Sequence, residues 1–127
     1  MRYLCMICYQ QTTLDKLSKP ELDALVAEAL AYDDELRKGG HYLYSGALQS
    51  VATARTLRIQ AAKVSITDGP FVETKEHIGG FIVIESRDFE EAIQLASKIP
   101  PGRLGPIEVR PIQELEPRRD LIGRTDP

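Results

Sequence analysis

Two segments, residues 2–9 and 79–85, carry apolar side chains on both of their alternating faces. Because successive side chains of a β-strand point to opposite faces of the sheet, a strand with this pattern has to be covered on both sides. The pattern therefore predicts two central strands. It also limits the fold to layered architectures in which another element buries each face of the sheet.

Residues 19–38 are predicted to form a long helix. Ser18 and Glu21 fit a capping box, in which the Ser hydroxyl accepts from a first-turn N–H and the Glu carboxylate reaches back. The Gly39-Gly40 pair ends the helix, because glycine adopts the left-handed cap conformation at little cost. The stripe at helical spacing consists of Leu22, Leu25, Val26, Ala29, Asp33 and Leu36, in which Asp33 is the one polar interruption.

The remaining segments complete an alternating order of strands and helices. The expected elements are a strand at residues 41–48, a hairpin at 54–59 and 63–67, a helix with Asp88 as its N-cap and Glu91 as its box partner, and a last strand at 106–112. The residues Gln60-Ala61-Ala62 at the hairpin turn are a weak turn signal, whereas Asp68-Gly69-Pro70 is a strong one. Tyr42 and Tyr44 are expected to share one face of their strand.

This order predicts an α+β fold of the ferredoxin-like βαββαβ type with an inserted hairpin. Two helices cover only one face of such a sheet, and the chain offers no third helix for the other face. We therefore expect a homodimer in which two copies pack sheet against sheet. The expected domain spans residues 1–114, and residues 115–127 form a charged C-terminal tail.

Composition and charge narrow the classes of function. The formal net charge of −3 does not favour nucleic acid, because nucleic-acid binding needs a clustered basic surface. No stretch reaches the roughly 20 apolar residues of a membrane helix, and the apolar start of the chain has no cleavage site. We expect a cytoplasmic protein without membrane contact and with reduced thiols.

Cys5 and Cys8 form a C-x-x-C pattern that invites a redox or zinc interpretation. On a strand, their odd spacing sends the two sulfurs to opposite faces, and a redox motif would need a helix to start here, which is not expected. Two buried core cysteines are the preferred interpretation. The chain also has no glycine loop that leads into a helix and no metal-binding His-x-x-x-His, so neither a cofactor nor a metal is expected.

Residues 67–81, with the sequence TDGPFVETKEHIGGF, resemble the signature of the DGPF family, a branch of the YCII-related proteins. Residues 88–92 and 107–111 extend the resemblance over nearly all of residues 1–112. The resemblance implies a ferredoxin-like subunit that forms a dimeric α+β barrel. It also implies a His–Asp active-site pair, as proposed for YCII relatives, or an association with extracytoplasmic-function sigma factors. The chain departs from the family at Ala61-Ala62, where the hairpin turn often carries glycine.

The candidate catalytic pair is Asp68 and His41, which would act as acid and base on a small polar metabolite without a cofactor. Arg110 could hold a substrate carboxylate through paired hydrogen bonds, and Tyr44 and Glu73 complete the candidate substrate-binding set. Each residue also has a structural alternative. Asp68 could close a turn, His41 could complement a helix end, and Arg110 could pair with Glu108 or a partner chain. Glu73 could lie in a solvated loop, and Tyr44 could line the barrel together with Tyr42. A non-catalytic ligand-binding or regulatory module, with a sigma factor as partner, and a structural dimer therefore remain alternatives to an enzyme.

Overall fold

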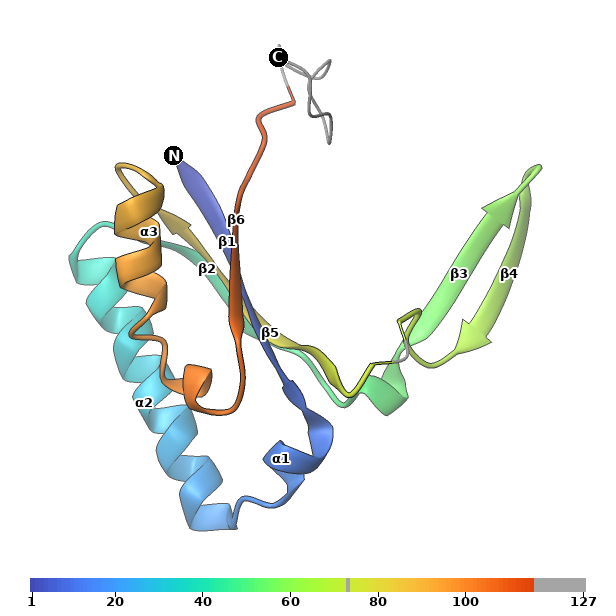
Figure 1. The fold of residues 1–127 in the computed structure, drawn as a ribbon, viewed down its shortest axis with the longest axis horizontal. Helices are drawn as coiled ribbons and strands as arrows, with labels where there is room; N and C mark the ends of the chain where they lie inside the picture. Colours follow the sequence, from blue (N-terminus) through green and yellow to red (C-terminus); the bar gives the residue numbers. More distant parts are fainter. Residues whose placement is uncertain (73, 116–127) are drawn as a thin grey trace.

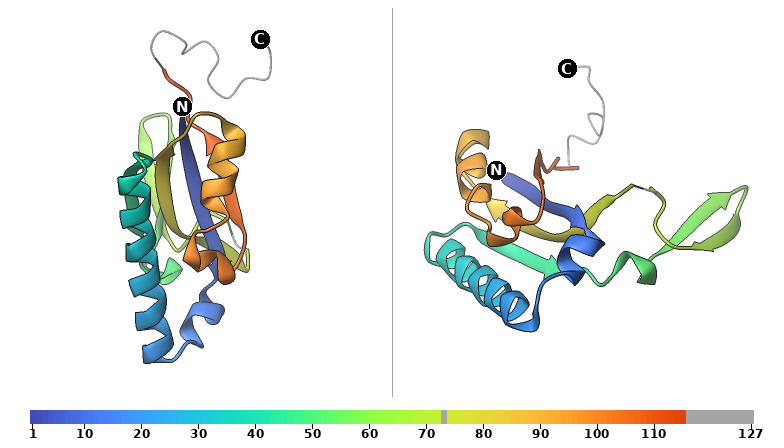
Figure 2. Two further views of the ribbon diagram at one scale, coloured as in Figure 1. Left: turned by 90° about the vertical axis from the view of Figure 1, so that its left-hand side faces the viewer. Right: turned by 60° about the horizontal axis from the view of Figure 1, so that its bottom comes forward.

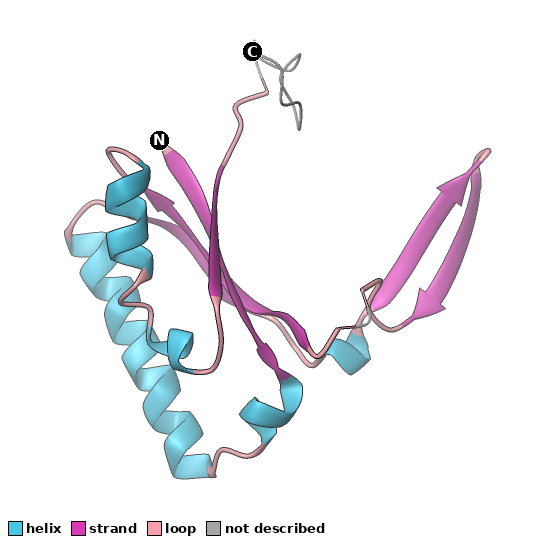
Figure 3. Cartoon of the chain, viewed as in Figure 1, coloured by secondary structure: helices cyan, strands magenta, loops and turns pink. Residues whose placement is uncertain are grey.

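The computed structural model describes residues 1–72 and 74–115. It consists of one sheet with helices on one side and a separate hairpin on the other side (Figures 1 and 3). In chain order the elements are β1 (Arg2–Gln10), α1 (Gln11–Asp15), α2 (Lys19–Lys38), β2 (Tyr42–Ala47), the 3-10 helix η1 (Val51–Thr53), β3 (Arg55–Gln60), β4 (Lys63–Asp68), β5 (Glu76–Glu85), α3 (Phe89–Ala96), the 3-10 helix η2 (Pro100–Arg103) and β6 (Ile107–Pro111).

The main sheet has four antiparallel strands in the order β2-β5-β1-β6. With the β3–β4 hairpin set aside, this is the strand order of a ferredoxin-like βαββαβ subunit, as the sequence predicts. Helices α2 and α3 cover the same face of the sheet (Figure 2). The two strands that are apolar on both faces, β1 and β5, lie in the middle of the sheet.

The core lies between the helices and the sheet. Alternate residues of β1 and β5 are buried there, with Tyr3 and Ile84 at 1% exposure each. The remaining core residues are Cys5, Ile7, Tyr32, Leu36, Ile82, Ala92, Ala96 and Ile99. On the opposite face of the same strands, Leu4, Met6 and Val83 are only half-buried. In the single chain, the sheet therefore buries one apolar face and leaves the other partly open to solvent.

The helix starts follow the local signals in the sequence. The Glu21 N–H donates to Ser18 Oγ at 3.2 Å, and the Ser18 N–H donates to Glu21 Oε1 at 2.9 Å, which confirms the capping box. Asp88 caps α3 by accepting from the Glu91 N–H at 2.9 Å. The expected box partner was wrong in detail, because the Glu91 carboxylate accepts from the Arg87 N–H instead of the Asp88 N–H.

Two further expectations were wrong. A short helix, α1, begins directly after β1, although no helix was expected near the cysteines. Both cysteines nevertheless belong to β1; Cys5 is buried, and its burial raises the pKa of its thiol to about 11. Tyr42 and Tyr44 do not share a face. The register of β2 against β5 shifts between them, so that Tyr42 pairs with Ile84 and Tyr44 with Val83, on opposite faces of β5.

Candidate functional site

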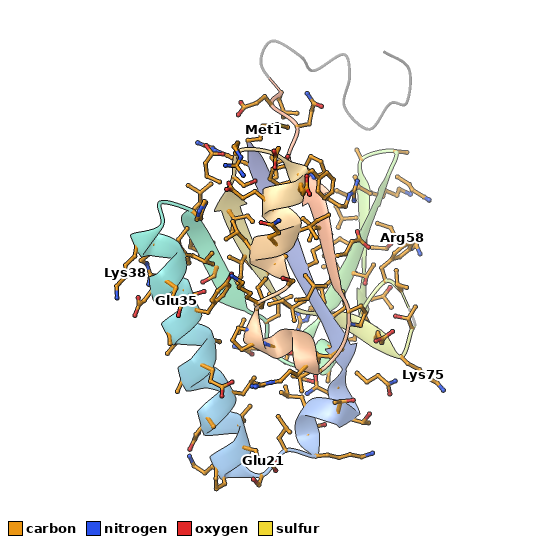
Figure 4. The ribbon with its side chains drawn as sticks, turned by 60° about the vertical axis from the view of Figure 1, so that its left-hand side comes forward. Met1, Glu21, Glu35, Lys38, Arg58 and Lys75 are labelled. Atoms are coloured by element: carbon orange, nitrogen blue, oxygen red, sulfur yellow. The ribbon has the colours of Figure 1, made fainter. Side chains whose placement is uncertain are left out.

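A cavity of about 420 Å³ lies between α2, the sheet and the segment that joins α3 to β6. Its walls are mostly apolar and include Leu25, Val26 and Leu30 of α2. Val26 and Leu30 are 50% and 60% exposed, although they belong to the apolar side of the helix. The charged residues Glu35 and Lys38 lie on the exposed surface of α2 (Figure 4). The apolar stripe of α2 is therefore split, because its last turns fill the core while its first turns line an open cavity.

Two polar side chains, those of Asp33 and Ser45, face each other in the wall of this cavity. Asp33 is only 8% exposed, and its Oδ2 accepts a hydrogen bond of 3.0 Å from the Ser45 hydroxyl. The Tyr42 hydroxyl lies 2.8 Å from Ser45 Oγ and donates to it when Ser45 donates to Asp33. The Arg37 guanidinium lies 4.1 Å above the centroid of the Tyr42 ring. The result is a chain of hydroxyl groups that ends on a buried carboxylate.

The register shift in β2 makes this arrangement possible. In a regular strand, residues three apart point to opposite faces. The irregularity between Tyr42 and Tyr44 adds a residue to β2, so that Tyr42 and Ser45 both point toward α2. Extra residues of this kind often re-aim side chains next to functional sites. The hydroxyl chain thus depends on one local distortion of an edge strand.

Glycines allow the strands to approach closely below the cavity. A Cβ atom on Gly46 would lie 3.1 Å from the Phe81 ring, and one on Gly80 would lie 3.1 Å from the Gly46 carbonyl oxygen. A Cβ atom on Gly79 would overlap the Tyr9 ring, whose hydroxyl donates to the Gly79 carbonyl at 3.4 Å. Burial raises the pKa of the Tyr9 phenol, so Tyr9 contributes a neutral ring and hydroxyl to the cavity wall.

The structure does not bring Asp68 and His41 together within one chain. His41 lies just before β2, where its Nδ1 is 2.8 Å from the Glu85 carbonyl oxygen. Asp68 ends β4, and its carboxylate lies 3.8 Å from the Arg55 guanidinium. His41 adjoins the first residue of β2, whereas Asp68 lies at the base of the hairpin that follows its last residue, and the six extended residues of β2 span about 20 Å. A catalytic role for either residue stays a prediction.

The candidate substrate-binding residues also lie away from the cavity. Tyr44 is 63% exposed and packs against Phe81 with 5.9 Å between the ring centroids. Arg110 is exposed on β6, opposite Leu4 of β1. Glu73 lies outside the described residues. None of the four described candidates lines the cavity, and their roles in binding stay predictions.

The sequence contained one signal for the cavity residues. Asp33 interrupts an otherwise apolar helical stripe, and an acidic side chain is rarely buried without a partner. Ser45 gave no comparable signal. Within residues 1–72 and 74–115, no three His, Cys, Asp or Glu side chains are placed to hold a metal ion. The helices of this part of the chain are too short or too polar to cross a membrane.

Comparisons with known proteins agree with this architecture. The model of the YCII-related domain matches residues 1–116. An uncharacterised protein of Rhizobium meliloti (strain 1021) is 29% identical over 115 residues, which are 88% of this chain and 93% of that protein. Among solved structures, 5-chloro-2-hydroxyhydroquinone dehydrochlorinase (TftG) from Burkholderia phenoliruptrix AC1100, in complex with 2,5-dihydroxybenzoquinone, is similar. Its TM-score is 0.51 at 18% identity, over 90% of this chain and 95% of that one.

These matches confirm the fold class and the resemblance found in the sequence. They do not bear on the expected sigma-factor partner, which stays a prediction. The pairing of two copies into a barrel also stays a prediction. The family match covers nearly all of the chain, from the first strand to beyond the last. The chain therefore belongs to the family of YCII-related domain proteins.

Proposed function

We propose that the chain is a small-molecule enzyme that binds a ring-sized organic metabolite in the cavity and uses Asp33 as its general base. One observation carries this proposal: a buried carboxylate ends a chain of hydroxyl groups in the wall of an otherwise apolar cavity. Apolar pockets with a few convergent polar groups are the usual form of small-molecule sites. Burying a carboxylate has a cost in folding free energy, so its position in such a wall favours a role in function.

The cavity also suggests the class of ligand. Its volume of about 420 Å³ lies in the lower part of the usual range for ligand pockets. Leucine and valine side chains would pack against a planar or aliphatic ring, and Asp33 and Ser45 would bind a hydroxyl or carbonyl group on that ring. The structural neighbour is named for its action on a hydroxyhydroquinone. That name supports hydroxylated six-membered rings as the first class to test.

The chemistry requires only proton transfer. In its ionised form, Asp33 would accept the proton of a ligand hydroxyl or of an acidic C–H bond, and the resulting carboxylic acid would return that proton to another atom of the anionic ring, which completes a tautomerisation and restores the carboxylate. The Ser45 and Tyr42 hydroxyls would hold Asp33 in place and redistribute their hydrogen bonds as its charge changes. The low polarity of the walls would strengthen these interactions once a bound ligand has displaced water from the cavity.

We further propose that the protein works as a homodimer that packs through the sheet face opposite the helices. The half-buried Leu4, Met6 and Val83 on that face support this pairing. It would cover the second face of the two-sided strands β1 and β5. The Asp68–His41 pair gains no support within the single chain, so Asp33 replaces it as the proposed base.

Thermal melting in the presence of ligands tests the cavity. A ligand at about 100 times its Kd adds roughly 2.7 kcal/mol to stability, which raises the Tm by several degrees. The panel contains 2,5-dihydroxybenzoquinone together with dihydroxybenzenes, and a Cys8→Ser background removes the partly exposed thiol that a quinone could alkylate. A compound that raises the Tm is then followed for turnover by its ring absorbance. Asp33→Asn should abolish turnover and reduce the Tm shift.

Asp34→Asn is the matched control, because Asp34 is the next residue of α2 but is exposed and paired with Arg37 at 2.6 Å. It should leave both the Tm shift and turnover unchanged. Binding and turnover that survive in Asp33→Asn would exclude Asp33 as the base. A panel in which no compound shifts the Tm would count against hydroxylated rings as the ligand class.

A further inference from the structure

The β3–β4 hairpin presents an apolar face to solvent in the single chain. Leu57 pairs with Ile66 and Ile59 pairs with Val64, and directly opposite residues of an antiparallel pair point to the same face. These four side chains are 56–71% exposed. At the base of the same face, the Arg55 guanidinium lies 3.8 Å from the Asp68 carboxylate, so the two charges there offset each other.

The other face of the hairpin is polar. Thr56 pairs with Thr67, Arg58 with Ser65 and Gln60 with Lys63. Figure 4 shows Arg58 on the outer part of the hairpin, and its guanidinium lies 5.0 Å from the centroid of the Phe71 ring. The hairpin is thus amphipathic, with one face suited to water and one face that needs a cover.

The hairpin has little to stabilise it within its own chain. A single two-stranded hairpin is at best marginally stable in water. Its turn adds strain, because Ala61 and Ala62 have φ angles of 51° and 65°, in a region that side-chain-bearing residues rarely adopt. Strained backbone of this kind persists where the surrounding structure holds it in place. With a strained turn and an uncovered apolar face, the hairpin would gain stability from a contact that covers this face.

A second copy of the chain would provide this contact. The hairpin lies on the side of the sheet that the helices leave uncovered (Figures 1 and 2). A copy that packs against Leu4, Met6 and Val83 would lie next to the hairpin, so the hairpin would continue the same interface. In a two-fold dimer, each subunit would offer its hairpin to the other. We propose that the apolar face of β3–β4 is a dimerisation arm that packs against the partner subunit and is stably ordered only in the dimer.

The inference rests on the homodimer part of the proposed function, and it is tested only by measuring how tightly two copies of the chain associate. Sedimentation equilibrium of the full chain over a range of concentrations gives the dimer Kd. Leu57→Thr with Ile66→Thr keeps β-forming side chains but removes apolar surface from the arm. Because a dimer contains each substitution twice, this variant should weaken dimerisation by about 100-fold or more. Gln60→Thr with Ser65→Thr changes the polar face and should leave the Kd within about threefold.

A second variant acts in the opposite direction. Ala61→Asn with Ala62→Gly supplies residues that favour positive φ in a two-residue hairpin turn. It should pre-organise the arm and tighten dimerisation by about tenfold. This result would stand even if the Leu57→Thr and Ile66→Thr variant failed to fold. Hydrogen exchange should show hairpin amides protected above the dimer Kd and unprotected below it.

A dimer of unchanged Kd in the Leu57→Thr and Ile66→Thr variant would overturn the proposal. A wild-type chain that stays monomeric at all concentrations would also overturn it and would leave a different partner as the cover of the arm. The cavity ligands are tested separately by melting, so a negative ligand panel would leave the association result intact. Conversely, loss of the dimer arm would not remove a ligand shift that depends on Asp33.

Discussion

Replacing Ser45 by Ala should destabilise the protein because it removes the hydrogen-bond donor of a buried carboxylate. The Ser45 hydroxyl donates to Asp33 Oδ2 at 3.0 Å, and Asp33 is only 8% exposed. Little water can reach the carboxylate to replace the lost hydroxyl. The Tyr42 hydroxyl also loses a partner, but Tyr42 is half-buried and water can compensate part of that loss.

The magnitude follows from the type of bond. A hydrogen bond to a charged group contributes about 1.5–3 kcal/mol, and we take about 2 kcal/mol for Ser45→Ala. For a chain of this length, each kcal/mol lowers the Tm by roughly 3–6 °C, so the expected decrease is roughly 6–12 °C. Asp33→Leu should behave differently. It removes the buried charge and adds a side chain that packs in the cavity wall, so stability should be unchanged or higher by about 1 kcal/mol.

The pair is therefore best measured as a double-mutant cycle. In the Asp33→Leu background, Ser45→Ala should lower the free energy of unfolding by less than about 1 kcal/mol, because no carboxylate remains that needs a hydrogen-bond donor. The assay is urea unfolding at neutral pH, with all four proteins at one concentration so that dimerisation does not change the comparison. An equal cost of Ser45→Ala in both backgrounds would refute the reasoning, because it would show that the two side chains are not energetically coupled.

Three further predictions concern parts of the fold outside the cavity. Ser18→Ala removes the N-cap of α2 and should lower the free energy of unfolding by about 1 kcal/mol, as measured by urea unfolding. A thiol reagent should modify Cys8 in the native protein but Cys5 only on unfolding, because Cys5 is buried with a pKa of about 11; native modification of Cys5 would contradict its place in the core. A hydrogen bond from the N-terminal amine, and then the charge of that amine, hold the pKa of the Glu85 carboxyl below its ordinary value of 4.5. The ionised Glu85 therefore stabilises the folded chain above pH 4.5, and this stabilisation is lost as the pH falls through the lowered pKa. Glu85→Gln should flatten the stability curve in that acid range and leave the rest unchanged.

The sequence determined the secondary structure and much of the fold, because the signals for these are local. Ser18 and Glu21, which are only three residues apart, form the capping box at the start of α2. The alternating pattern of residues 54–67 encoded the hairpin, and the two-sided apolar pattern of residues 2–9 and 79–85 marked the two central strands of the sheet. The short helix α1 escaped prediction, because five residues are too few to show a helical period.

The candidate site depended on the tertiary structure. Asp33 and Ser45 are 12 residues apart on a helix and a strand, and only the packing of α2 against the sheet brings them into contact. The irregularity in β2 then turns Tyr42 and Ser45 to the same face, against the alternation that the sequence implies. Conversely, Asp68 and His41 looked like an acid–base pair by residue type alone, and the fold holds them on separate elements.

Sequence patterns thus encode what each segment prefers by itself, since helix caps, strand alternation and turn residues act over a few neighbours. A cavity and its chemistry arise from contacts between distant segments, and those contacts depend on packing and register. For this protein, the sequence alone determined the main helices and strands and the family. The folded chain decided which carboxylate is buried, which hydroxyl meets it, and which apolar side chains stay exposed in the single chain.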